Sequence, residues 1–224
     1  DRHMWPVSTI LTFIAANSCF LYYLFAVVPT MTTYQPDLVS NIATGILGLG
    51  ASQVVQFVTG MGAAPTGKFN VGPLSLDASL PVNIAWWTME QPSFLVPAMM
   101  LYKNAQLVPS AHPGGLFLCM FIAHYFRRSM IYPWTSRGRP YPLHAWASAM
   151  IFTAANGTFQ ANWLLYGARF EADEFNSPRA LLGYIVFVCG MGWNIHADWT
   201  LRTLRKPGER AYKIPHGGLC THLQ

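Results

Sequence analysis

Charged side chains are scarce in this sequence. They make up 10% of its 224 residues, whereas hydrophobic residues make up 52%. An average soluble domain is about a quarter charged, so the composition argues against an ordinary water-facing surface. We therefore expect lipid to be the main solvent of the chain. The length suits one membrane domain with about six spans of roughly 20 residues each.

Acidic residues are outnumbered, nine against 14 basic residues, which gives a formal net charge of +5. The basic residues do not cover a polar face. They stand beside apolar segments in two short clusters, one formed by Arg127, Arg128, Arg137 and Arg139 and one running from Arg202 to Lys213. This distribution excludes nucleic acid as the expected partner and favours anionic lipid head groups or a phosphorylated cofactor.

Cysteine patterns typical of metal sites are also missing. The four cysteines show no CxxC or other metal-type spacing; they are Cys19, Cys119, Cys189 and Cys220. The first three lie in apolar runs, where we expect buried, inert thiols. His196 and Asp198 have no further ligand at a suitable spacing, so the sequence predicts no metal site.

Long apolar runs alternate with stretches rich in proline and glycine. Each run approaches the length that crosses a bilayer core, which predicts an all-α, polytopic transmembrane helix bundle of about six spans. The runs are residues 6–28, 39–61, 84–102, 115–132, 144–166 and 180–200. Arginine and lysine gather after the fourth and sixth runs, whereas the loop between the fifth and sixth is slightly acidic. This asymmetry places both ends of the chain on the cytoplasmic side.

Glycines in the second run form a GxxGxG pattern at Gly45, Gly48 and Gly50. The pattern opens no βαβ unit, so we interpret it as a surface for close helix packing and not as a phosphate cradle. Asn156-Gly157-Thr158 in the fifth run matches a glycosylation sequon. Because it lies inside an apolar run, we expect interior polar contacts from it.

A carboxylate, Glu90, stands near the middle of the third run. An ionised carboxylate is costly to bury there, so such groups face the bundle interior and hold a proton or a partner. A protonated Glu90 can donate a hydrogen bond to a ketone oxygen of an apolar ligand. The structural alternative is a hydrogen bond between helices, or an ion pair with an arginine of the fourth run.

Tyrosine and arginine close the fourth run. Tyr125 is the kind of weak acid that stabilises negative charge developing on a carbonyl oxygen. Arg127 and Arg128 are suited to phosphate because the guanidinium fork matches its oxygens. Positive-inside topology with interfacial tyrosines explains the same composition without a site.

A polar stripe is predicted on the sixth run. In a helix, Asn194, Asp198, Arg202 and Arg205 lie three or four residues apart and share one face. Such a stripe can hold a nicotinamide, a ribose and a phosphate in sequence. The alternative is an i,i+4 ion pair between Asp198 and Arg202, with the remainder exposed.

In their order along the chain, these motifs resemble the steroid 5α-reductase family over about residues 86–219. They are Trp86-Trp87 with Glu90-Gln91-Pro92-Ser93; His124-Tyr125 with Arg128 and Tyr132; Arg137-Gly138-Arg139-Pro140-Tyr141-Pro142; Asn156-Gly157 with Gln160; and Gly190-Met191 with Asn194-Ile195-His196, Asp198, Leu201-Arg202, Leu204-Arg205-Lys206-Pro207-Gly208 and Tyr212-Lys213-Ile214-Pro215. The last block is the most specific of these motifs.

The resemblance implies NADPH-dependent reduction of the C4–C5 double bond of a 3-oxo-Δ4 steroid. Glu90 and Tyr125 inherit the role of holding the 3-ketone, while hydride passes to C5 and C4 takes a proton. The implied cofactor contacts are Trp86, Arg128, Arg137, Arg139, Asn194, Asp198, Arg205, Tyr212 and Lys213. No role is assigned to Arg127 or Ser136. The apolar bundle would supply a water-poor pocket for a steroid or sterol-like lipid, in an endoplasmic reticulum membrane of a eukaryote.

The expected organisation is an N-terminal membrane segment over residues 1–61, a loop over 62–83, the reductase-like core over 84–219 and a divergent tail over 220–224. Two runs precede the glutamate motif where the family usually has one. The family also continues past Leu219 with segments that close over the cofactor, so we expect a truncated form that lacks part of the cofactor site.

Two alternatives remain open: a related enoyl-CoA or polyprenol reductase, and a non-catalytic sterol-binding paralogue. Cofactor binding separates the second from an enzyme. The sequence does not fix the natural steroid or the oligomeric state.

Overall fold

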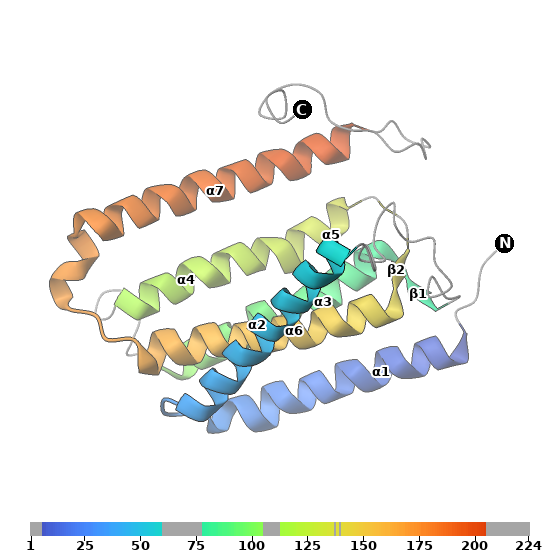
Figure 1. Ribbon diagram of the computed structural model, residues 1–224, viewed down its shortest axis with the longest axis horizontal. Coiled ribbons are helices and arrows are strands. Elements are labelled where there is room, and N and C mark those ends of the chain that lie inside the picture. Colours follow the sequence, from blue (N-terminus) through green and yellow to red (C-terminus); the bar gives the residue numbers. More distant parts are fainter. Residues whose placement is uncertain (1–5, 60–77, 105–112, 137, 139, 205–224) are drawn as a thin grey trace.

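The computed structural model describes residues 6–59, 78–104, 113–136, 138 and 140–204. Each of the six predicted runs is helical in its described part (Figure 1). The main helices are α1 (Val7–Tyr22), α2 (Pro36–Thr59), α3 (Val82–Lys103), α4 (Pro113–Phe126), α5 (Tyr132–Thr135), α6 (Leu143–Asn162) and α7 (Pro178–Thr203).

Short wider or tighter helical turns extend several of these helices. Three π-helical turns follow α1, α4 and α6, over Tyr23–Val27, Arg127–Ile131 and Trp163–Gly167. Turns of 3₁₀ helix cover Val28–Thr30 and Ala172–Asn176.

A small antiparallel pair of strands departs from the all-α prediction. β1 (Ser79–Leu80) pairs with β2 (Tyr141–Pro142), in the register Ser79 to Pro142 and Leu80 to Tyr141. Both strands follow stretches of sequence rich in proline and glycine, and two-residue strands carry no periodic signal in a sequence. The pair ties the start of α3 to the start of α6.

The core forms where α3 and α6 lie side by side. The two helices approach closely at Gly157 of α6, because a Cβ there would lie 2.9 Å from the Pro92 carbonyl oxygen and 3.1 Å from the Cα of Ser93. Pro92 lies inside α3, where a proline interrupts the backbone hydrogen bonds of the helix. Polar side chains of α6 bond to this part of α3: Thr153 donates to the Met89 carbonyl (2.5 Å) and accepts at its own carbonyl from Ser93 (2.9 Å).

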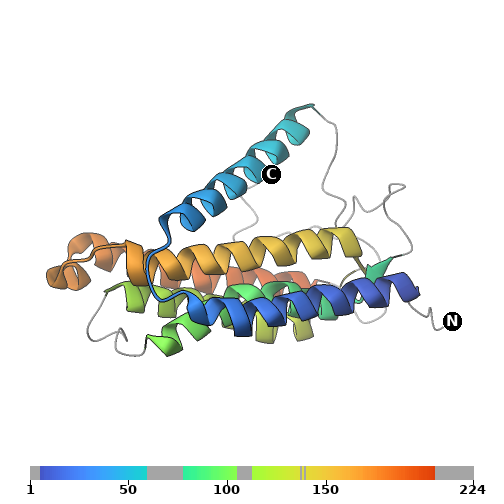
Figure 2. The same ribbon diagram turned by 90° about the horizontal axis from the view of Figure 1, so that it is seen from below.

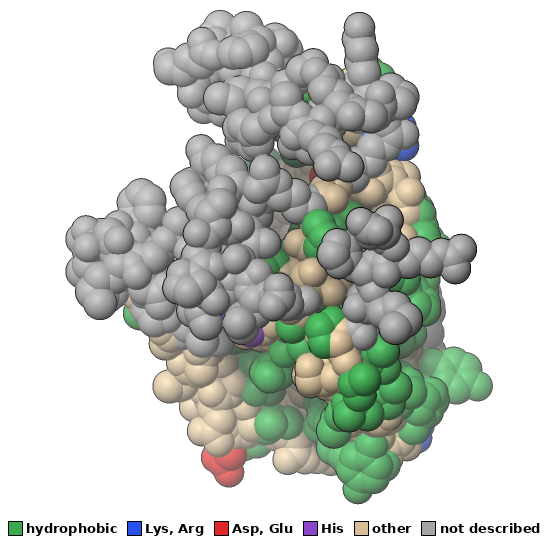
Figure 3. Space-filling model, turned by 90° about the vertical axis from the view of Figure 1, so that its right-hand side faces the viewer, with side chains coloured by type: hydrophobic (Ala, Val, Ile, Leu, Met, Phe, Trp, Pro, Cys, Tyr) green, Lys and Arg blue, Asp and Glu red, His purple; other side chains and the backbone are tan. Residues whose placement is uncertain are grey.

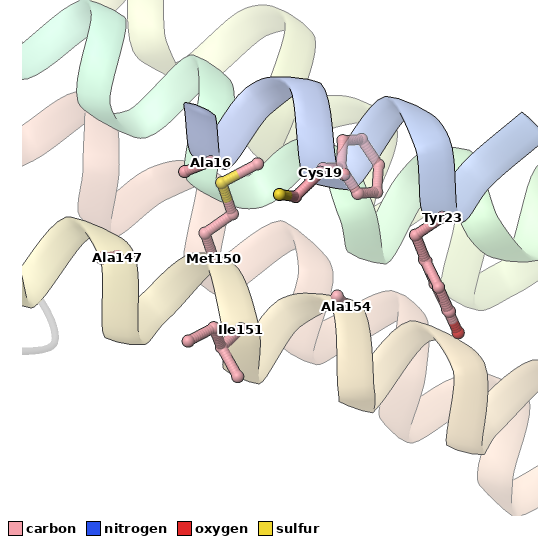
Figure 4. Close-up of a pocket in the computed structure, with 8 residues that line it drawn as sticks. Ala16, Cys19, Tyr23, Ala147, Met150, Ile151 and Ala154 are labelled. Carbon is pink, nitrogen blue, oxygen red and sulfur yellow. The ribbon is translucent and has the colours of Figure 1, made fainter. Parts of the chain in front are cut away.

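Helix α1 packs along α6 on one side of this core. It contributes Phe20, and the helical turns that extend it contribute Leu24 and Val28. Tyr23 makes a 2.5 Å hydrogen bond with Thr158 of α6. Between the two helices lies an apolar groove of about 330 Å³, into which the Met150 side chain reaches from α6 (Figure 4).

Helices α2 and α7 lie at the periphery. α2 leans away from the bundle (Figure 2), and a Cβ at Gly45 or Gly48 would meet nothing within 4 Å. The prediction of close helix packing at these two glycines is therefore wrong for the described part of the chain. The close approach occurs instead at Gly157, where a small residue meets the proline-containing helix.

The cysteines correct a second prediction. Cys19 and Cys189 are exposed and Cys119 is half-buried, although all three were expected to be buried. α1 and α7 each present only part of their surface to the bundle, so an apolar position on these helices need not be interior. Cys220 lies outside the described residues.

Two helical stretches in the described part of the chain are long and apolar enough to cross a membrane: Val7–Thr30, with a mean hydropathy of 1.8, and Pro178–Thr203, with 1.4. No residue of α7 is buried, and Leu182, Val188 and Trp193 are among its exposed apolar side chains. At the end of the bundle that carries the two strands, hydrophobic side chains also gather on the visible described surface (Figure 3). Length and composition thus agree with spans at α1 and α7, while the count of about six stays a prediction.

Candidate functional site

Glu90 is buried on α3 and faces the end of α4. Arg128, in the π-helical turn that continues α4, places Nη2 3.3 Å from Glu90 Oε1. The ion pair considered from the sequence as a structural alternative is therefore present. It also joins two residues that were assigned separate roles, one toward substrate and one toward cofactor.

Aromatic rings enclose the Arg128 guanidinium. Its central carbon lies 4.7 Å from the ring centroid of Trp86 and 4.6 Å from that of Tyr132. Trp86 in turn packs edge-on against Tyr132 and Tyr141, at 5.1 and 6.2 Å between centroids. Cation–π contacts of this kind hold the guanidinium in a defined position beside Glu90.

Tyr141 on β2 is a site neighbour to which sequence analysis assigned no role. Its burial raises the pKa of its phenol, and the negative charge of Glu90 raises it further. Tyr141 therefore keeps its proton beside the carboxylate. Its place in a proline-rich motif gave no signal of this contact, which depends on β2 folding back onto the start of α3.

Tyr125 lies on α4 within electrostatic reach of Glu90. Its hydroxyl oxygen accepts a 3.2 Å hydrogen bond from Asn156 Nδ2 of α6, and its ring packs against Phe121 at 4.6 Å. Asn156 acts as the donor, and Ser93 of α3, whose own proton goes to the Thr153 carbonyl, is a second hydrogen-bond partner of the Tyr125 hydroxyl. The expected interior polar contact of Asn156 is thus a contact with the predicted catalytic tyrosine.

Arg127 joins the two predicted cofactor residues of α7. Its Nη1 donates to Asn194 Oδ1 at 2.9 Å and its Nη2 donates to Asp198 Oδ2 at 2.7 Å. Asp198 therefore pairs with the π-helical turn that continues α4, and not with Arg202 as in the alternative considered from the sequence. Sequence analysis left Arg127 without a role. The i,i+4 spacing of Asn194 and Asp198 places both side chains on one helix face, where a single guanidinium can bind both, and this was the signal available in the sequence.

The structure thus brings six of the predicted site residues into one connected region. Glu90, Trp86 and Arg128 touch directly, Tyr125 lies beside Glu90, and Asn194 and Asp198 connect through Arg127 to the neighbouring Arg128. The remaining predicted cofactor residues, Arg137, Arg139, Arg205, Tyr212 and Lys213, lie outside the described residues. In the described part of the chain, no group of three or more His, Cys, Asp and Glu is placed to hold a metal ion.

Several described groups are of the kind that can hold a nicotinamide dinucleotide. The Arg128 guanidinium suits phosphate oxygens, the amide and carboxylate of Asn194 and Asp198 suit a carboxamide or ribose hydroxyls, and the Trp86 ring offers an aromatic face. Placed polar groups of this kind fix the orientation of a ligand in cofactor sites generally.

Comparison with known proteins gives a consistent result. The profile of the family described as 3-oxo-5-alpha-steroid 4-dehydrogenase matches residues 139–223. The chain is 44% identical over 144 residues to the protein called 3-oxo-5-alpha-steroid 4-dehydrogenase 2 of Rattus norvegicus, covering 64% of this chain and 56% of the relative. It is 40% identical over 157 residues to the protein of the same name in Sus scrofa, covering 70% and 61%.

A longer match is found with 3-oxo-5-alpha-steroid 4-dehydrogenase 1 of Homo sapiens. Identity there is 35% over 182 residues, covering 81% of this chain and 67% of the relative. The chain spans 56% to 61% of the length of the two type 2 relatives above.

Proposed function

The chain belongs to the 3-oxo-5-alpha-steroid 4-dehydrogenase family, and from this premise we propose that it reduces the C4–C5 double bond of a 3-oxo-Δ4 steroid. The observation that carries the proposal is that Glu90 of α3 is buried and that Tyr125 of α4, which is half-buried, lies within electrostatic reach of it. A ketone oxygen on an otherwise apolar skeleton needs few polar partners, and those partners should be buried with it.

Tyr125 would act on the 3-ketone. Asn156 donates to the oxygen of its hydroxyl, and Ser93 of α3 is a second hydrogen-bond partner of the same group. A ketone oxygen that takes the place of Ser93 would receive the Tyr125 proton. A phenol hydrogen-bonded to the ketone oxygen stabilises the negative charge that develops there when C5 is reduced. Asn156 thereby orients the catalytic group.

Glu90 would be the second partner of the ketone when it carries a proton, because only the acid form can donate a hydrogen bond to a carbonyl. The contact with Arg128 sets its direction before substrate arrives. Tyr141, which keeps its proton, packs against Trp86 in the same cluster and would limit the space open to the A ring of a steroid.

The cofactor in this proposal is NADPH. Trp86, Arg128, Asn194 and Asp198 would hold it, together with Arg137, Arg139, Arg205, Tyr212 and Lys213. When bound, it supplies the hydride that reduces C5. The protein's part is to place C5 of the steroid toward α7 and to keep water away, while a proton reaches C4.

We also place the enzyme in a membrane, as a multi-pass protein of about six spans in the endoplasmic reticulum. The exposed apolar surfaces of α1 and α7 support lipid as their surroundings. A steroid would then reach the site from the bilayer, in which it dissolves.

Steady-state turnover of purified full chain in detergent tests this function, with NADPH and a 3-oxo-Δ4 steroid as substrates. Tyr125→Phe should lower kcat by about 10²- to 10³-fold, because it removes one donor to the developing oxyanion. Glu90→Gln should lower it by about 10²-fold or more. Tyr102→Phe, at an exposed position near the end of α3, serves as the matched control.

Equal rates for Tyr125→Phe and Tyr102→Phe would contradict the proposed role of Tyr125. Steroid binding without turnover, in wild-type protein supplied with NADPH, would favour a sterol-binding protein over a reductase.

A further inference from the structure

Helix α7 carries two of the proposed cofactor residues, yet it contributes little to the core. None of its residues is buried. It meets α4 through the rings of Phe117 and Tyr184, whose centroids are 6.0 Å apart, and through the Arg127 bridge near its other end. In lipid, the association of an apolar helix face with another helix gives little hydrophobic stabilisation. Polar contacts therefore matter more for the placement of α7.

The Arg127 bridge, formed by Arg127 with Asn194 and Asp198, has a specific two-pronged geometry. The two nitrogens of one guanidinium reach two acceptors that lie one helical turn apart. The side chains of Arg127 and Asp198 are 13% and 16% exposed, so water competes weakly for the contact. Charge-assisted, two-pronged contacts of this kind fix direction as well as distance.

The position of Arg127 in the chain connects the Arg127 bridge to Glu90, the proposed substrate residue. Arg127 begins the π-helical turn, and the next residue, Arg128, contacts Glu90 on α3. Consecutive arginines therefore reach in different directions, one to α7 and one to α3. Single π-helical turns within helices frequently mark functional sites.

We propose that Arg127 is a positioning residue that docks α7 onto α4 and so presents Asn194 and Asp198 at the correct distance from Glu90 and Tyr125. The inference rests on the proposed function, because it assigns those two residues of α7 to the cofactor. Without the bridge, the docked position of α7 is one of several, and the apparent cofactor affinity falls with the fraction of molecules in it.

Direct binding of NADPH to the purified full chain, without steroid, is the first measurement. Arg127→Met should weaken binding by about tenfold, which corresponds to a docked fraction reduced to about one tenth. Arg127→Lys should lose less, because an ammonium keeps the charge but cannot fork to both acceptors. Arg179→Met, which removes an exposed arginine at the start of the same helix, should bind as the wild type does.

A cross-link separates positioning from direct contact with the cofactor. Cysteines replace Phe117 and Tyr184 in a background without the natural cysteines, and a short thiol-specific linker pins α7 to α4. Pinning should restore NADPH affinity to Arg127→Met, because the linker takes over the work of the bridge. An Arg127 that binds a cofactor phosphate itself would leave the pinned variant as weak as the free one, which overturns the inference.

The outcomes also distinguish the two proposals. Wild-type protein that binds NADPH, alongside Arg127→Met that binds it equally well, overturns the positioning role alone. Wild-type protein that binds no NADPH overturns both the cofactor assignment and this inference.

Discussion

Replacing Gly157 by alanine tests the helix contact that brings α3 and α6 together. The new Cβ would lie 2.9 Å from the Pro92 carbonyl oxygen, 3.1 Å from the Cα of Ser93 and 3.3 Å from Cδ of Pro97. These are backbone and ring atoms, which cannot rotate out of the way, so the two helices must separate. Overpacking of this kind costs about 1–3 kcal/mol.

The helical preference of alanine opposes this cost. Alanine is favoured over glycine in a helix interior by about 1 kcal/mol. The expected net effect of Gly157→Ala is a loss of up to about 2 kcal/mol in the free energy of unfolding. Gly45→Ala is the matched control, because a Cβ there meets nothing within 4 Å and only the helical preference remains.

Thermal unfolding of the detergent-solubilised full chain, followed by tryptophan fluorescence, gives the comparison. The midpoint of Gly157→Ala should fall, and that of Gly45→Ala should stay or rise. Turnover should fall with Gly157→Ala as well, since α3 carries Glu90 and α6 carries Asn156. A Gly157→Ala protein that is as stable as Gly45→Ala would refute the contact between the two helices.

Three further predictions concern groups around the site. Asn156→Leu should lower kcat by about tenfold with little change in KM, because Tyr125 loses the donor that orients it; steady-state kinetics measures this. Thr153→Val should lower the unfolding midpoint, because a buried carbonyl of α3 loses its hydroxyl donor at a cost of about 1–3 kcal/mol. Because burial and the charge of Glu90 raise the pKa of Tyr141, its phenol should ionise above the usual value of about 10. A pH titration of tyrosinate absorbance measures this, with Tyr141 identified by the signal that Tyr141→Phe loses. Glu90→Gln should lower the midpoint pH of the Tyr141 titration.

Exposed positions supply controls for these three changes: Asn41→Leu, Ser148→Val and Tyr102→Phe. Equal effects of Asn156→Leu and Asn41→Leu on kcat would count against the orienting role. Equal unfolding midpoints of Thr153→Val and Ser148→Val would count against the hydrogen bond from Thr153 to α3. The sign of the Tyr141 prediction also has a consequence for stability: above the ordinary tyrosine pKa the unfolded chain ionises first, so this group's contribution to stability declines as the pH rises.

The helices were predictable because each corresponds to a long apolar run of the sequence that is bounded by proline and glycine. Which of them form the core was not, since α2 and α7 are as apolar as their neighbours yet stay outside it. Gly45 and Gly157 show the reason: a small residue permits close packing but does not specify a partner. The site divides in the same way, because Glu90 and Tyr125 stand in local motifs, whereas Arg127 and Tyr141 depend on contacts between segments far apart in the chain.

Transfer of the hydride itself gives the most direct test of the central claim. Full chain in detergent is supplied with NADPH that carries deuterium at both hydrogen positions of the nicotinamide C4, together with a 3-oxo-Δ4 steroid. The product is analysed by mass spectrometry and NMR. The account predicts one deuterium at C5 of the reduced steroid with wild-type protein and with Tyr102→Phe, and greatly reduced product with Tyr125→Phe. Wild-type protein that yields no C5-deuterated steroid, or Tyr125→Phe that yields as much as Tyr102→Phe, would contradict it.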